Sequence, residues 1–125
     1  MAGETDITKQ VLDESGVLHT FDNADTSNNN KFANPNGNDI FLIVKNPGAS
    51  AATATITAQK TSFSKAGEGV LTKADSVVSL NAGEEKIVGP FPKGSWNDAN
   101  GEIILTAGGA GAADIDYAVI QLPKF

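Results

Sequence analysis

Cysteine and arginine are both missing from this 125-residue chain, and histidine occurs once, as His19. Without cysteine there can be no disulfide, no thiolate-ligated zinc site and no cysteine nucleophile. A single histidine leaves little material for a catalytic triad or a multi-histidine metal site. We therefore interpret His19 as an ordinary strand residue.

Positive charge is also scarce, because nine lysines stand against fifteen acidic residues and the net charge is −6. Surfaces that bind nucleic acid are usually basic and often use arginine to grip phosphate or guanine. We therefore expect no nucleic-acid partner. The negative charge favours solubility instead, and it could steer the chain towards a basic surface.

Long apolar runs are absent as well, and the longest covers only residues 40–44. A membrane-spanning helix needs about 20 apolar residues. The first residues do not form a basic, apolar leader, so we expect neither a membrane span nor a secretory signal. The length is typical of one domain.

Short apolar or alternating runs, separated by Gly, Pro, Asn and Asp, recur along the chain and are typical of an all-β domain. They predict an antiparallel β-sandwich of jelly-roll or Greek-key type with about seven or eight strands. The expected strands are residues 7–12, 17–21, 39–46, 52–60, 76–80, 84–88, 101–107 and 114–122. We interpret residues 61–74 as a long connection, and residues 81–83 and 108–111 as hairpin turns.

Two of the expected strands have informative faces. The strand at residues 39–46 is apolar on both faces, so we expect it to be central and covered on both sides. The strand at residues 52–60 carries alanines and Ile56 on one face and threonines on the other. This alternation is a strand signature, and the small face leaves room for a bulky neighbour.

Residues 1–16 are polar and weakly patterned, and we interpret them as an extended N-terminal arm before a single β-sandwich domain at residues 17–125. Two interpretations of the arm stay open: a floppy terminus, or a segment that docks on a neighbouring subunit. In the second interpretation, Ile7, Val11 and Leu12 are the candidate contact residues.

The loop at residues 89–98 combines two prolines with Phe91 and Trp96, a large apolar load for a loop. These two aromatics and Phe125 are further candidate contact residues, because aromatic side chains often anchor interfaces. The alternative is that Phe91 and Trp96 cap the core, because tryptophan is highly buried on average.

The carboxylates do not form a convincing catalytic or metal site. Asp114 and Asp116 share a strand face and could serve a cation or acid–base chemistry, but a solvated strand start is the simpler interpretation. Residues 22–28 and 98–102 lack the order of ligands that a calcium loop needs, and we interpret them as turns. The glycine-rich segment 108–111 lacks the lysine and the helix start of a phosphate loop. We therefore expect no enzyme, no catalytic residue, no metal and no cofactor.

Residues 30–46, 83–92 and 96–101, in this order, resemble small virion proteins of tailed bacteriophages that are often assigned as head decoration (cement) proteins. The resemblance extends over about residues 30–122 and rests mostly on the turns around strands. It implies a non-enzymatic structural protein that binds the outer capsid surface and stabilises the shell. It also implies the major capsid protein as partner, self-association as a homotrimer or homodimer, and a place on the virion after synthesis in the host cytoplasm. No site residue is carried over from this family.

Two other functions stay open. One is a tail- or neck-associated β-domain of the virion. The other is a carbohydrate-binding β-sandwich module, which is suggested by Trp96, Tyr117 and the Asn-rich loops. Sugar binding usually uses two or more exposed, coplanar aromatic rings, and the chain has one Trp and one Tyr.

Overall fold

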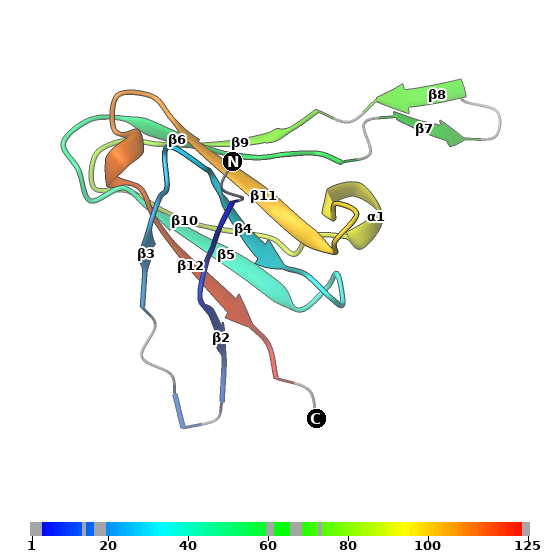
Figure 1. Cartoon of the computed structure of the whole chain (residues 1–125), viewed down its shortest axis with the longest axis horizontal. Coiled ribbons are helices and arrows are strands. Elements are labelled where there is room, and N and C mark those ends of the chain that lie inside the picture. Colours follow the sequence, from blue (N-terminus) through cyan, green and yellow to red (C-terminus); the bar gives the residue numbers. More distant parts are fainter. Residues whose placement is uncertain are drawn as a thin grey trace.

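The computed structural model describes residues 4–13, 15–16, 20–59 and 74–123, together with the backbone of residues 62–65 and 69–72. Strands dominate this part of the chain, which confirms the expected all-β class (Figure 1). Its helices are short: α1 (Lys93–Trp96) and the 3₁₀ turn η1 (Ala112–Asp114). The strands are β1 (Thr5–Asp6), β2 (Lys9–Val11), β3 (Asp22–Asn23), β4 (Asn30–Ala33), β5 (Ile40–Lys45), β6 (Ala52–Ile56), β7 (Ser62–Lys65), β8 (Gly69–Thr72), β9 (Ser76–Leu80), β10 (Glu85–Val88), β11 (Glu102–Gly108) and β12 (Asp116–Gln121).

The strands form two larger sheets, which we call sheet A and sheet B. Sheet A has the order β1-β4-β11-β6-β9, and sheet B has the order β10-β5-β12-β2, with β3 also paired to β12. Most pairs are antiparallel, but β1 is parallel to β4 and β2 is parallel to β12. The expected antiparallel pairing holds for most strands, but the sheets are mixed because the N-terminal segment adds one parallel strand to each.

Several local predictions also need correction. Residues 30–33 form β4 where only turn chemistry was recognised, and the expected connection at residues 61–74 contains the β7–β8 hairpin. Neither expected hairpin turn joins paired strands: β9 and β10 lie in different sheets, and so do β11 and β12. The expected strand at residues 17–21 falls largely outside the described residues.

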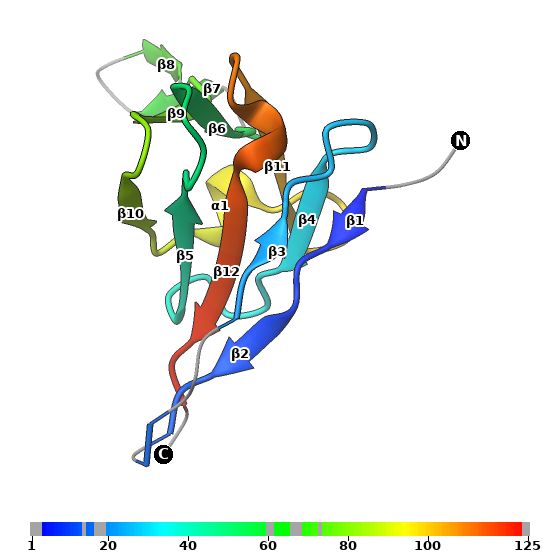
Figure 2. The same ribbon diagram turned by 90° about the vertical axis from the view of Figure 1, so that its left-hand side faces the viewer.

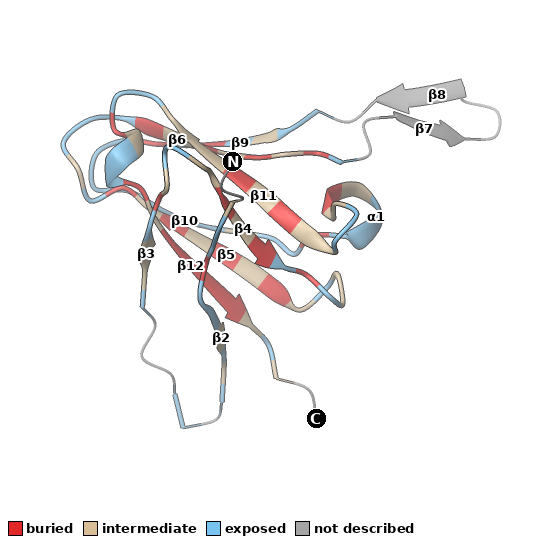
Figure 3. Ribbon diagram, viewed as in Figure 1, coloured by how far each residue is buried: buried red, intermediate tan, exposed pale blue. Residues whose placement is uncertain are grey.

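One buried cluster of apolar side chains draws on both sheets, and we call the face of each sheet that contributes to it the inner face. In β5, Ile40, Leu42 and Val44 are completely buried, whereas Phe41 and Ile43 on the outer face are half-buried (Figure 3). The strand is central, between β10 and β12, as expected. The expectation that both of its faces are covered was wrong, since only the inner face is fully enclosed.

Strand β6 in sheet A follows the predicted alternation. Ala52, Ala54 and Ile56 are buried on the inner face, and Thr53 and Thr55 are half-buried on the outer face. The small inner side chains permit close packing, while the β-branched threonines suit the solvated side of a sheet.

The N-terminal arm docks on the body of its own chain. The amide of Thr5 donates to the carbonyl of Asn29 and the amide of Ile7 donates to that of Lys31, at the edge of sheet A. A few residues later, the amide of Leu12 donates to the carbonyl of Gln121 at the edge of sheet B. Ile7 lies at this crossing and is only 4% exposed, so the arm joins the edges of both sheets (Figure 2).

Candidate functional site

Three of the predicted contact residues belong to the core. Ile7, Phe91 and Trp96 are 4%, 3% and 8% exposed and are part of the cluster that both sheets share. Side chains buried in this way cannot present a surface to another molecule while the chain keeps this conformation. For Phe91 and Trp96, the structure agrees with the alternative interpretation, in which the two side chains cap the core.

The reason lies in how the loop at residues 89–98 folds. The ring of Phe91 packs between those of Phe32, at 5.8 Å, and Trp96, at 6.2 Å in an edge-to-face arrangement. Such aromatic pairs gain stability beyond their area burial. The buried amide of Asn34 donates to the carbonyl of Phe91 at 2.7 Å and to Oδ1 of Asn97 at 2.8 Å, which fixes the loop over this end of the core.

The other predicted contact residues lie near the end of β2 and at the C-terminus. Val11 is 51% exposed, and Leu12 is half-buried on the outer side of sheet B. Phe125 lies outside the described residues.

Leu12 lines an apolar groove of about 340 Å³ that lies across the outer face of sheet B. The register explains how it forms, because Ile87 of β10 lies opposite Ile43 of β5, and Ile120 of β12 lies opposite Phe41. Their side chains therefore form neighbouring rows on one face. We call this feature the apolar groove; its lining residues are Leu12, Phe41, Ile43, Ile87, Ile120 and Leu122.

Two lining residues are well exposed to water. Ile87 is 71% exposed and Leu122 is 39% exposed. Scattered apolar side chains are normal on protein surfaces, but a contiguous apolar patch marks an interaction site more often. The groove is therefore the candidate functional site.

The outer face of sheet A is chemically different. Thr53, Thr55 and Thr106 line its middle, and Lys31 donates to Glu102 at 3.3 Å nearby. The hydrogen bond and charge of Glu102 raise the pKa of Lys31. Val77 on the edge strand β9 is its well-exposed large apolar residue, at 58%. Ile104 of β11 is half-buried on the same face, opposite Lys31. Polar side chains surround it, so this face is mainly a solvated sheet surface.

Two of the described carboxylates, Asp25 and Asp98, stabilise turns by accepting hydrogen bonds from nearby backbone amides. The side chain of Asp25 accepts hydrogen bonds from the Thr5 hydroxyl and from the amides of Ser27 and Asn28, and these bonds lower its pKa to about 2. Asp98 accepts from the amides of Asn100 and Glu102. Both arrangements are the turn chemistry expected for these segments.

Asp114 and Asp116 do not share a strand face, contrary to the expectation. Asp114 ends η1 and packs against Gly48, where a Cβ would have no room, whereas Asp116 begins β12 and accepts a hydrogen bond from Asn23 at 3.1 Å. Among the described residues, no three His, Cys, Asp or Glu side chains are grouped so that they could hold a metal ion. His19 lies outside the described residues.

A second hollow, of about 260 Å³, lies where the start of β6 meets the end of β9. Its lining includes Thr53, Ser79 and Asn81, and it contains no ionisable side chain among the described residues. This hollow offers hydrogen bonds but no acid, base or nucleophile of the kind that a catalytic site needs.

Five groove residues, Phe41, Ile43, Ile87, Ile120 and Leu122, were not predicted as contacts. One signal was visible in the sequence, namely that the strand containing Phe41 and Ile43 is apolar on both faces. Periodicity alone cannot say whether the second face is covered by the same chain or left for another molecule.

Comparison of the chain with protein families, characterised proteins and solved structures found no match in any of the three. Within the described residues, no helix has the length and apolar character needed to cross a membrane.

Proposed function

We propose that this chain is a non-enzymatic structural protein that docks on a larger protein assembly through the apolar groove. Following the resemblance described above, the assembly we propose is a bacteriophage capsid, with the chain binding its outer surface as a decoration protein. We also propose that the two sheets pack as a β-sandwich of jelly-roll or Greek-key type, so that the outer face of sheet B is free to contact the shell. The observation that carries the proposal is the contiguous apolar lining of the groove.

The groove has the composition of an interface core. Burying apolar surface stabilises a complex by about 25 cal/mol for each Å² removed from water. A few well-packed apolar side chains in the centre of an interface usually supply most of the binding energy. Phe41 and Ile43 lie in the floor of the groove and Ile87 lies at its exposed edge, so a partner could cover all three.

Charge supports the same function. A net charge of −6 keeps the free chain soluble despite its apolar groove. A basic surface on the partner would steer the encounter. Binding to the assembled shell, and not to its dissociated subunits, would stabilise the shell by mass action. The partner we propose is the major capsid protein, with a homotrimer or homodimer of this chain adding avidity over the symmetric lattice.

Burial makes a carbohydrate-binding module the weaker alternative. Trp96 is 8% exposed and Tyr117 is fully buried, so neither ring is available to stack on a sugar. A tail- or neck-associated role in the virion would use the same groove and differs from the proposal only in location.

The test begins with virions of the phage that encodes the chain. Heads and tails are separated and analysed by mass spectrometry, and we expect the chain in the heads. Its recovery in tails alone would support the neck or tail role instead, and its absence from virions would overturn the proposal.

A second step uses heads that lack the protein. We expect these heads to release DNA at a lower temperature and to regain stability when wild-type protein is added. Ile87→Asp should bind the heads about 30-fold more weakly or worse, because hot-spot substitutions cost about 2 kcal/mol or more. Val77→Asp is the matched control on sheet A, since Val77 is also an exposed apolar residue on an edge strand. Equal loss of binding in both variants would contradict a role for the groove.

A further inference from the structure

Strand β10 forms an open edge of sheet B, next to the apolar groove. It pairs with β5 on one side, and the described structure places no strand on its other side (Figure 2). The amide of Asn46 donates to the carbonyl of Glu84, and the antiparallel register continues from this pair. Because bonded positions alternate along an antiparallel pair, Lys86 and Val88 bond towards β5, while Glu85 and Ile87 direct their backbone groups outwards.

The neighbouring edge strand, β9, has an outward backbone group that is already occupied. Strand β9 ends sheet A on the same side of the molecule, and the Lys86 ammonium donates to the carbonyl of Ser79 on β9 at 2.6 Å. Within the described part of the chain, no hydrogen bond occupies the outward backbone groups of Glu85 and Ile87.

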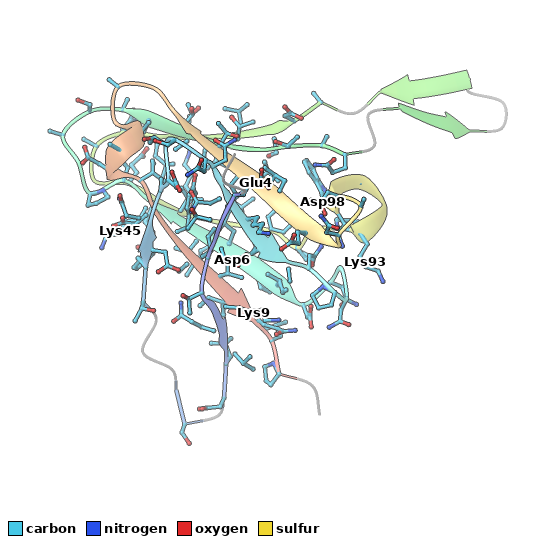
Figure 4. All side chains as sticks on the ribbon, viewed as in Figure 1. Glu4, Asp6, Lys9, Lys45, Lys93 and Asp98 are labelled. Carbon is cyan, nitrogen blue, oxygen red and sulfur yellow. The ribbon has the colours of Figure 1, made fainter. Side chains whose placement is uncertain are left out.

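The side chains on this edge add specificity. Glu85 and Ile87 are two residues apart on β10, so both point to the outer face. Lys45, which is labelled in Figure 4, is opposite Glu85 in the register. Its ammonium lies over the Phe21 ring, 5.0 Å from the centroid. Glu85 therefore has no ion-pair partner within the described residues. The edge presents one unpaired carboxylate beside one exposed apolar side chain.

We infer that β10 accepts an extended segment of the partner protein as an added antiparallel strand of sheet B. The segment carries an apolar residue opposite Ile87 and, two residues later, a lysine or arginine opposite Glu85. Main-chain hydrogen bonds to Glu85 and Ile87 provide the attachment, and the alternate side chains determine which sequence fits. This inference rests on the proposed function, because it specifies how the partner reaches the apolar groove.

The experiment uses the full chain labelled with ¹⁵N and a blocked synthetic peptide, Thr-Thr-Val-Thr-Lys-Thr-Thr. In antiparallel register its valine lies opposite Ile87 and its lysine opposite Glu85. We expect saturable shifts of the Glu85 and Ile87 amide signals and slower hydrogen exchange at both amides. A peptide with glutamate in place of lysine should bind about fivefold more weakly, since one cross-strand charge pair contributes up to about 1 kcal/mol. Glu85→Lys should reverse this order of affinity.

Proline substitution tests the main-chain bonds directly. Ile87→Pro removes an outward amide that bonds to nothing in the described structure, so an edge strand can tolerate it. Val77→Pro is the matched control on β9, where the alternation also directs residue 77 outwards. We expect Ile87→Pro to abolish peptide binding and Val77→Pro to leave it unchanged. If Ile87→Pro fails to fold, the charge reversal with Glu85→Lys still decides the question.

The failures of this inference and of the proposed function can be told apart. No shift at Glu85 and Ile87, or equal binding of both peptides, would overturn strand addition even if the protein is found on heads. Shifts of the same amides that depend on protein concentration without peptide would also overturn it, because the occupant would then be a second copy. Peptide binding by a protein that is absent from heads would reject the capsid function and keep the strand-addition site.

Discussion

The outer faces of sheets A and B differ in chemistry although their inner faces are alike. On sheet A, Thr53, Thr55 and Thr106 meet water beside the Lys31–Glu102 ion pair. On sheet B, Phe41 and Ile43 occupy the corresponding outward positions. The inner faces of both sheets contribute to one core, which is what folding requires. Folding does not require an apolar outer face, so the difference supports the docking surface proposed above.

The N-terminal arm connects the two sheets, and changing it gives the largest effect we predict. Ile7→Ala should lower the free energy of unfolding by about 2–4 kcal/mol, because it leaves a cavity in the shared core. Val11→Ala is the control within the arm and should cost less than about 0.5 kcal/mol, since Val11 is 51% exposed. Urea unfolding of both variants measures the difference. Similar losses would show that the arm does not join the sheets through Ile7.

Much of the all-β architecture could be predicted from the local sequence pattern. The errors of that prediction have a common cause. Alternation in β6 located the strand and its buried face correctly. Strand β4 was missed because its first residue, Asn30, resembles a turn residue. In the structure Asn30 is buried and accepts a hydrogen bond from the amide of Asp25. The expected hairpins were wrong because turn chemistry is local, whereas the choice of partner strand depends on distant packing.

The candidate site was harder to predict than the fold. Phe91 and Trp96 were predicted as contact residues because they are aromatic residues in a loop. In the structure, the short helix α1 and the Asn34 hydrogen bonds hold both side chains in the core. Ile87 was not predicted as a contact residue, because it directly follows two glutamates and a lysine in a short segment. The pairing of Ile87 with Ile43 and of Ile120 with Phe41 assembles the groove, and strand pairing is a long-range property.

Making the outer face of sheet B resemble that of sheet A should give the next largest effect. Phe41→Thr should weaken partner binding about tenfold, because truncating a central interface residue typically costs more than 1 kcal/mol. The reciprocal change, Thr55→Val on sheet A, should leave binding unchanged and alter stability by no more than about 0.5 kcal/mol. Binding to isolated heads and thermal unfolding test both variants. A binding loss from Thr55→Val would mean that the polar face also contacts the partner.

A substitution at Tyr117 tests whether the inner face of sheet B contributes to stability and not to partner binding. Its hydroxyl is buried without a hydrogen-bond partner in the described structure, and burial raises its pKa to about 12. Since the folded pKa exceeds the usual value of 10.0, this group leaves the stability of the fold independent of pH below about pH 10. Stability then falls as pH rises from 10 towards 12, because the unfolded chain loses the phenol proton more readily than the folded one. Tyr117→Phe should stabilise the fold by about 1 kcal/mol at neutral pH, because it removes an unsatisfied buried hydroxyl.

Unfolding curves at pH 7 and pH 11 measure this effect, and partner binding should stay unchanged at neutral pH. A destabilised Tyr117→Phe variant would indicate that the hydroxyl has a partner after all. A change in binding without a change in stability would contradict the separation of the inner and outer faces.

The smallest effect concerns how the arm is held at each sheet. At sheet A, Thr5 donates to Asp25, whose pKa is lowered to about 2 from its usual value of 3.8. Because the folded pKa is depressed, this tie is intact above about pH 4 and is lost as pH falls through 2. At sheet B, the amide of Thr8 donates to a carboxylate oxygen of Asp22, but Leu12 is tied by a backbone bond to Gln121, and the neutral side chain of Gln10 bonds to the backbone of Thr20. Acid should therefore loosen the sheet A end of the arm first.

Hydrogen exchange of two amides distinguishes the ends. Between pH 4 and pH 2, protection of the Thr5 amide should fall relative to that of Leu12, and Asp25→Asn should remove this pH dependence while lowering Thr5 protection at every pH. The variant separates Asp25 from the other carboxylates that become protonated over the same range. If protection of the Thr5 and Leu12 amides falls in parallel in the wild-type chain, the arm leaves the two sheets as one unit. The two sheets would then differ in their outer faces but not in how they hold the arm.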